Sequence, residues 1–168
     1  MFSMMKFSLV LFAFTSTTCI NPFAPGWDEE TDKSICPNLN EIDGVLCNFR
    51  NAYLFKDTTI YGTLISPNFN FIYRDYDRGV DVLWGRDDEM RTTYGLFQSA
   101  AALSLIWNNE VSSSGDSVRQ TIVRSFNLTI TFNPGDIVRI DGYANLTFER
   151  ESFLSPWKIV RWRDESNF

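Results

Sequence analysis

The sequence contains no histidine among its 168 residues. Histidine is the commonest general base and a frequent metal ligand, so its absence excludes Ser-His and Cys-His nucleophile pairs and many metal sites. Any chemistry in this chain would have to use carboxylates, Tyr, Lys or Arg. We expect neither a bound metal nor a cofactor.

Basic residues are also scarce: 15 Lys and Arg stand against 21 Asp and Glu, a formal net charge of −6. Proteins that bind nucleic acid usually carry a clustered basic surface. We therefore do not expect nucleic acid as a partner. The length suggests one domain, which can bury about two-thirds of its unfolded surface without a metal or a set of disulfides.

Long hydrophobic runs are missing as well. The most apolar stretch, residues 7–14, is too short to cross a bilayer as a helix. It follows a single cation, Lys6, and is followed by small polar residues. This order predicts a secretory signal peptide over residues 1–18.

The end of this leader resembles the lipobox of bacterial lipoproteins, in which a Cys is diacylated and becomes the mature N-terminus. Cys19 occupies that position, although Ser16 replaces the usual Leu and Thr18 the usual Gly or Ala. We expect Cys19 to be lipidated, because two acyl chains anchor a protein stably. The alternative is an ordinary cleaved signal with a free or paired Cys19.

Residues 19–37 have no apolar periodicity, contain Pro22 and Pro25, and carry four acidic side chains over residues 28–32. This composition indicates an extended, solvated tether behind the lipidated Cys. We expect secretion across the inner membrane of a bacterium, and membrane anchoring in the cell envelope.

Two further cysteines, Cys36 and Cys47, could form a disulfide in an oxidising envelope. Apolar residues at helical spacing, however, predict a helix from about residue 40 to 56. Eleven residues of helix would separate the sulfurs too far for a bond. The sequence favours two thiols, and a disulfide would require the helix to begin late.

The most regular pattern lies in the C-terminal third, where apolar residues alternate with polar ones over residues 118–132. Two further runs, 137–150 and 157–163, complete a predicted antiparallel meander. Between the first two, Pro134 and Gly135 predict a type II turn with positive φ at Gly135. Strands this long should bend, near Gly142, and present a concave side to any ligand.

The N-terminal half predicts two more helices and shorter strands. Asp57 is placed to cap a short helix that ends before Ser66-Pro67, and a strand follows as far as Tyr73. A third helix begins at Arg86. Its expected core stripe is Met90, Tyr94, Phe97 and Ala101. A strand over residues 103–107 and a polar loop over 108–116 complete the expected order.

This order resembles the nuclear transport factor 2-like superfamily, which includes steroid isomerases, scytalone dehydratase, polyketide cyclases and many non-catalytic members. The resemblance covers residues 39–164, and its main pieces are Arg74-Asp75, Trp84-Gly85-Arg86 and the closing residues 157–162. It implies an α+β cone over residues 38–168, with about three helices packed on a strongly bent antiparallel sheet. None of these pieces is a catalytic signature.

The resemblance also implies a pocket between the concave sheet and the helices, with a carboxylate base near the end of the first strand. Asp75 lies in that region, and Tyr53 on the first helix could face the same cavity. These two are the catalytic candidates. The alternatives are that Asp75 is a surface acid and that the strand presents Tyr73.

We also place Tyr73, Trp107 and Arg124 in the expected ligand pocket. Arg124 interrupts the apolar face of its strand. It could bind an acidic ligand, pair with a buried acid such as Asp141, or lie at an exposed strand end.

Two functions remain open. The first is a non-catalytic, membrane-anchored envelope protein whose domain binds an apolar or acidic small molecule or takes part in assembly. Either function is compatible with a homodimer that forms through the sheet. The second is a cofactor-independent isomerase, dehydratase or cyclase. If Asp75, Tyr53 and Arg124 converge on one cavity, the enzyme is favoured.

Overall fold

The structure is a computed structural model that describes residues 36–166. The predicted signal peptide, Cys19 and nearly all of the predicted tether lie outside the described residues. None of the helices within residues 36–166 has the length and hydropathy needed to cross a membrane.

The described chain forms three helices and six strands. In order they are α1 (Ile42–Phe55), α2 (Thr58–Leu64), β1 (Ile65–Asp75), β2 (Val80–Gly85), α3 (Arg86–Ser99), β3 (Ala102–Gly115), β4 (Arg119–Asn133), β5 (Asp136–Glu149) and β6 (Lys158–Ser166). The strands make one sheet in the order β2-β1-β6-β5-β4-β3. The α+β class and the β4-β5-β6 meander are confirmed, but β1 and β6 run parallel, so the sheet is mixed rather than purely antiparallel.

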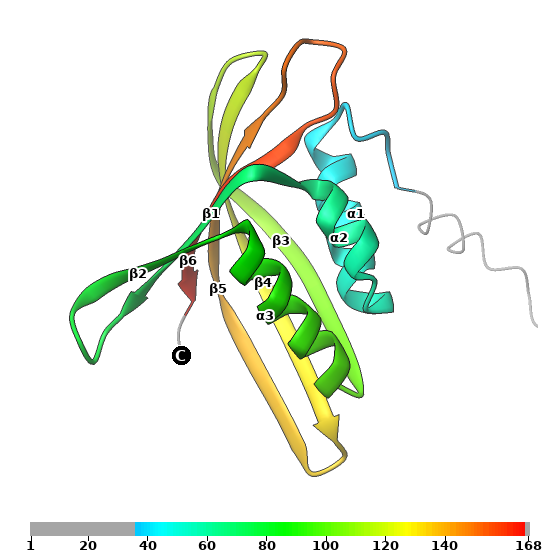
Figure 1. Ribbon diagram of the computed structural model, residues 1–168, viewed down its shortest axis with the longest axis vertical. Coiled ribbons are helices and arrows are strands. Elements are labelled where there is room, and N and C mark those ends of the chain that lie inside the picture. Colours follow the sequence, from blue (N-terminus) through cyan, green and yellow to red (C-terminus); the bar gives the residue numbers. More distant parts are fainter. Residues whose placement is uncertain (1–35, 167–168) are drawn as a thin grey trace, which may run out of the picture. The chain divides into compact units, whose positions relative to one another are not determined.

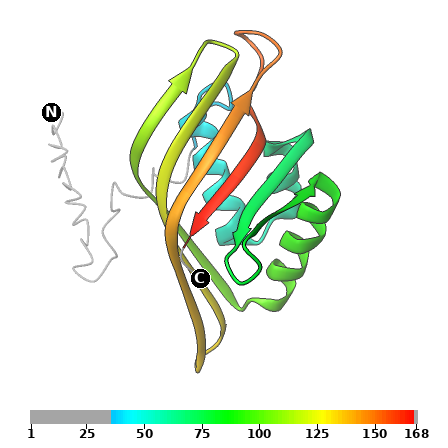
Figure 2. The same ribbon diagram turned by 90° about the vertical axis from the view of Figure 1, so that its left-hand side faces the viewer.

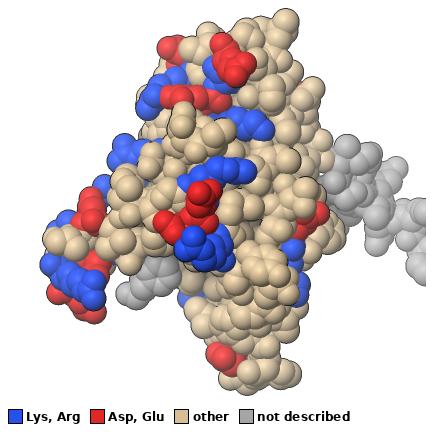
Figure 3. Space-filling view, viewed as in Figure 1, with Lys and Arg blue, Asp and Glu red and all other residues tan. Residues whose placement is uncertain are grey.

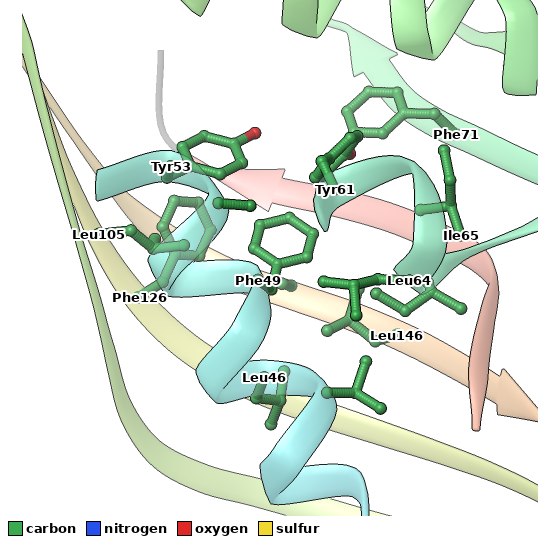
Figure 4. Close-up of a cluster of buried hydrophobic side chains, with 14 of the residues drawn as sticks. Leu46, Phe49, Tyr53, Tyr61, Leu64, Ile65, Phe71, Leu105, Phe126 and Leu146 are labelled. Atoms are coloured by element: carbon green, nitrogen blue, oxygen red, sulfur yellow. The ribbon is translucent and has the colours of Figure 1, made fainter. Parts of the chain in front are cut away.

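The helices cover one face of the sheet, and the long strands curve around them (Figures 1 and 2). Phe49 of α1 lies at the centre of the buried cluster between helices and sheet, where its ring packs edge-on against Tyr61 (Figure 4). At Gly142 of β5 the neighbouring strand β6 comes close, because a Cβ there would lie 2.3 Å from the Cα of Ser166. Glycine at this position allows the two strands to pair.

The start of α1 decides the state of the cysteines. The helix begins at Ile42, so Cys36 lies in the preceding turn, and it forms a disulfide with Cys47 across a Cα–Cα distance of 5.5 Å. The interpretation as two thiols was wrong, because residues 37 and 38 fold back over Gly44 in the first turn of α1, where a Cβ would lie 2.2 Å from the backbone oxygen of Asn38. Closing this short loop reduces the entropy of the unfolded chain and stabilises the fold by about 3 kcal/mol.

The cap of α2 is as predicted. The Oδ1 atom of Asp57 accepts hydrogen bonds from the backbone N–H groups of Thr59 (2.8 Å) and Ile60 (2.9 Å). These bonds satisfy two of the donors that a helix N-terminus leaves free.

The buried face of α3 differs from the predicted stripe. Tyr94 is 55% exposed and Ala101 is also exposed, whereas Glu89, Thr93 and Phe97 are buried. The core face is therefore rotated by one residue from the one that the apolar residues indicated. Of the predicted stripe, Phe97 is buried and Met90 is half-buried against the core, and α3 adds the carboxylate of Glu89 to the interior.

Two turns also differ from the predictions. Residues 108–115 are not a loop but the continuation of β3, which pairs with β4 as far as Gly115 and Gln120 and contains two register shifts. Because these side chains are exposed on both faces, no alternation marks the strand in the sequence. Gly135 does not have a positive φ; its N–H instead donates to Oδ1 of Asn133 at 3.0 Å.

Candidate functional site

A cavity of about 220 Å³ lies between the helices and the concave face of the sheet. Its walls come from α1, α3 and all six strands. Most lining side chains are aromatic or aliphatic: Phe49, Phe71, Trp84, Leu96, Leu105, Trp107, Phe126, Leu128, Ile130, Ile140 and Trp162. The polar lining consists of Tyr53, Glu89, Thr92, Thr93 and Asp164.

Local structure places these side chains. Tyr53 follows Phe49 by one turn of α1, and their rings stack at 5.1 Å. On β4, alternate residues point to the same face, so Phe126, Leu128 and Ile130 all line the cavity. The exposed Thr92 and the half-buried Leu128 mark the region where the cavity meets solvent.

Tryptophan side chains form two of the walls. The indole N–H of Trp107 donates to the backbone oxygen of Leu46 at 3.0 Å, which fixes β3 against α1. The ring of Trp84 stacks on Phe71 with 4.5 Å between centroids. The hydrogen bond of Trp107 and the stacking of Trp84 therefore fix the positions of these two rings in the cavity wall.

Glu89 is the most buried charged residue of the site, with 4% of its surface exposed. Its Oε1 accepts hydrogen bonds from the hydroxyl groups of Tyr61 (2.6 Å) and Thr93 (3.1 Å), and its Oε2 accepts one from Nε1 of Trp84 (2.7 Å). The carboxylate also lies in the first turn of α3, where the helix dipole favours negative charge. Three donors and the helix terminus together compensate the burial of this charge.

Asp164 is the second carboxyl group of the cavity. Its oxygens accept hydrogen bonds from the backbone N–H (3.1 Å) and the hydroxyl (2.9 Å) of Ser166. Burial raises the pKa of Asp164 above its ordinary value, although the bonds from Ser166 oppose that shift. Asp164 therefore holds a proton more readily than a surface aspartate.

Two further residues that line the cavity carry hydrogen-bond donors. Nε1 of Trp162 is buried and makes no hydrogen bond within residues 36–166. Burial, with the nearby charges of Glu89 and Asp164, raises the pKa of the Tyr53 hydroxyl, so this group stays protonated and remains a donor. A buried donor without a partner costs about 1–3 kcal/mol.

The predicted site residues do not gather in one place. Tyr53 and Trp107 line the cavity, whereas Tyr73 does not but packs 5.5 Å from the ring of Trp84. Asp75 ends β1 in the β1–β2 hairpin, where it lies 3.7 Å from Arg78. Figure 3 shows charged side chains of both signs gathered over this hairpin, outside the cavity.

Arg124 also lies outside the cavity. Its Nη1 pairs with Oδ1 of Asp43 at 3.2 Å, and its Nε donates to the backbone oxygen of Asn108 at 2.8 Å. It does not pair with Asp141, which is exposed on the neighbouring strand. Tyr53, Asp75 and Arg124 therefore do not converge.

Sequence reasoning missed Glu89 and Asp164, although each carries a weak signal. Glu89 shares a helical face with Thr93 and Phe97, at intervals of four residues. Asp164 follows Trp162 at the two-residue interval of a strand, which places both on one face. Both carboxylates have charged neighbours in the sequence, which indicate solvent exposure, and their burial was therefore not predicted.

No family model matches the sequence, and no curated protein matches it. Solved structures do match the fold. A conserved protein from Planctomyces limnophilus aligns with a TM-score of 0.65 and 13% identity, over 75% of this chain and 93% of that one. A proposed dehydratase of the nuclear transport factor 2-like family from Streptomyces avermitilis aligns at 0.60 and 12% identity, over 75% and 94%. A proposed scytalone dehydratase from Novosphingobium aromaticivorans aligns at 0.61 and 12% identity, over 76% and 82%.

The substitution Glu89→Gln tests the buried network. The side-chain NH₂ group of Gln is a donor, and it would replace a carboxylate oxygen that accepts a hydrogen bond, so at least one of the three bonds is lost. We therefore expect the free energy of unfolding, measured in urea, to fall by about 2 kcal/mol. Asp87→Asn, on the same turn but exposed, should change it by less than about 0.5 kcal/mol. Equal effects of the two substitutions would contradict the network.

The raised pKa of Asp164 predicts a pH dependence of stability. Between the unfolded and folded pKa values the folded protein holds a proton that the unfolded chain has released, so this group destabilises the fold as pH rises. Relative to Asp164→Asn, the wild type should lose stability as pH rises above about 4, the ordinary pKa of an aspartate. Urea unfolding of both proteins at a series of pH values measures the difference, and a constant difference or the opposite slope would refute the assignment.

Proposed function

We propose that this domain, which has the nuclear transport factor 2-like fold, binds a small and largely apolar ring compound that carries one hydrogen-bond acceptor. The observation that carries the proposal is the cavity, an apolar space of about 220 Å³ with few polar groups. Small-molecule sites commonly have this character, with a few polar groups that fix the orientation of the ligand.

The size of the cavity limits the ligand. Sites for drug-sized molecules have volumes of about 300–1,000 Å³, so about 220 Å³ suits one ring or two fused rings. Flat aromatic faces favour such a ring, because Phe71, Trp84 and Trp107 can stack on it or meet it edge-on.

The polar groups suggest what the ring carries. The indole N–H of Trp162 is a donor only, and the hydroxyl of Tyr53 stays protonated. A ketone or ether oxygen could accept from either group, and a bond from Trp162 would remove the cost of an unpaired donor. This pairing supports a ligand with one acceptor oxygen.

A second candidate is cofactor-independent proton transfer, as in an isomerase, dehydratase or cyclase. It is favoured by Asp164, because burial raises the pKa of this carboxyl group above its ordinary value, and groups that transfer protons are commonly tuned in this direction. The similar solved structures include proposed dehydratases. We favour binding without turnover, because both oxygens of Glu89 already accept hydrogen bonds and only Asp164 is left for proton transfer.

Binding of 1-tetralone, with tetralin as the matched compound that lacks the oxygen, tests the proposal. We expect 1-tetralone to bind with a Kd below about 1 mM and to shift the indole N–H signal of Trp162 in NMR spectra, whereas tetralin, which accepts no hydrogen bond, should bind more weakly and shift that signal less. Leu128→Trp, which fills the cavity, should weaken binding at least about tenfold. The control is Leu83→Trp on the exposed β2. Equal binding by both variants would refute the site.

The same samples separate the two candidates. In D₂O, proton transfer by Asp164 would remove a proton from C2 of 1-tetralone and return a deuteron, which mass spectrometry detects. Binding alone predicts the same exchange rate with and without protein. An accelerated rate that Asp164→Asn abolishes would favour the enzyme.

We also propose that the chain is a membrane-anchored lipoprotein of the cell envelope, secreted across the inner membrane and diacylated on Cys19. The support is the leader sequence. The Cys36–Cys47 disulfide agrees with an oxidising compartment outside the cytosol.

The intact mass of the N-terminal peptide from the native host tests the anchor. We expect two acyl chains on Cys19 in the membrane fraction, because diacylation provides stable attachment. An unmodified N-terminus in the soluble fraction would overturn this part of the proposal and leave the ligand site untouched.

A further inference from the structure

A second pocket, of about 230 Å³, lies between α1 and strands β3 and β4. We call it the arginine pocket, because Arg50 of α1 and Arg124 of β4 both line it, together with Asp43 and an apolar wall that includes Leu46 and Ile106. Trp107 and Leu105 line both spaces, so they separate this pocket from the cavity. In Figure 1, α1 lies beside β3.

A bulge in β3 positions Arg124. The pairing of β3 with β4 shifts register between Trp107 and Glu110, which leaves Asn108 out of the regular ladder. Its backbone oxygen accepts from Nε of Arg124 at 2.8 Å. Bulges commonly redirect side chains at sites, and here the bond holds the guanidinium of a side chain that is only 23% exposed.

Arg50 supplies a second guanidinium. It lies one turn after Cys47, and its Nη2 is 3.9 Å from the sulfur of that residue. No carboxylate within residues 36–166 lies within 4 Å of its nitrogens. The disulfide fixes Cys47, and therefore also fixes the part of α1 that carries Arg50.

Asp43 indicates what these arginines can hold. Its Oδ1 lies 3.2 Å from Nη1 of Arg124, yet its side chain is 79% exposed. An ion pair this exposed contributes little, about 0–1 kcal/mol. Asp43 can therefore rotate into solvent and leave its place to another carboxylate, which two guanidinium groups would bind more strongly than one.

We infer that the arginine pocket binds the carboxylate of a small apolar acid. The guanidinium groups of Arg50 and Arg124 pair with the two carboxylate oxygens, and the apolar body of the acid packs on Leu46, Ile106 and Trp107. The pocket is separate from the cavity, so it is independent of the function proposed above.

Benzoate, with benzyl alcohol as the neutral control, tests this inference in NMR titrations of the whole mature chain. Benzoate should shift the Nε–H signals of both arginines, and Arg50→Gln and Arg124→Gln should each weaken it by at least about tenfold. The exposed Arg91→Gln should bind like the wild type. Benzyl alcohol should shift neither arginine.

Asp43→Asn keeps the test decisive if a variant of the half-buried Arg124 fails to fold. Removing the competing carboxylate should tighten benzoate binding about two- to fivefold. Unchanged affinity in Asp43→Asn, unchanged affinity in both Gln variants, or benzoate shifts at Trp162 instead of the arginines would each overturn the inference. Failure of either set of variants to change benzoate binding would leave the binding of 1-tetralone, reported by Trp162, unaffected, so the two proposals fail separately.

Discussion

The structure depends on one buried charge, the carboxylate of Glu89. Burial of an ionised group is tolerated only when donors replace its water. Tyr61 of α2, Trp84 of β2 and Thr93 of α3 supply those donors, so one carboxylate joins two helices to the edge of the sheet. The position of α3 over the concave face, and with it the width of the cavity, follows from this constraint.

The resulting cavity has few polar groups, and these groups differ in whether their hydrogen bonds are satisfied. Glu89 has its hydrogen bonds satisfied and acts as a support, whereas the indole N–H of Trp162 has no partner among the described residues, and the hydroxyl of Tyr53 stays protonated as a donor. Asp164 adds a carboxyl group that burial keeps closer to its neutral form. A satisfied group holds structure, whereas an unsatisfied donor on a residue that lines the cavity is a candidate contact for a ligand. Trp107 links this site to the arginine pocket, since it lines both.

Much of the fold was predictable, because local patterns determine it. Alternation identified β4, and Asp57 marked the start of α2. What failed depended on contacts between distant segments. Glu89 looked like a surface acid because one of its three hydrogen-bond donors, Tyr61, lies 28 residues away on another helix. Arg124 likewise pairs with Asp43, 81 residues away. The disulfide of Cys36 depended on a shift of two residues in the start of a helix, which periodicity does not resolve.

The most direct test of the account is a crystal structure of the domain with 1-tetralone. The central claim is that the unpaired donor of the cavity exists for a ligand acceptor. We predict that the ketone oxygen lies within about 3 Å of Nε1 of Trp162, with the rings against Phe71, Trp84 and Trp107. A ligand bound elsewhere, or a Trp162 that stays without a partner beside a bound ligand, would contradict the claim.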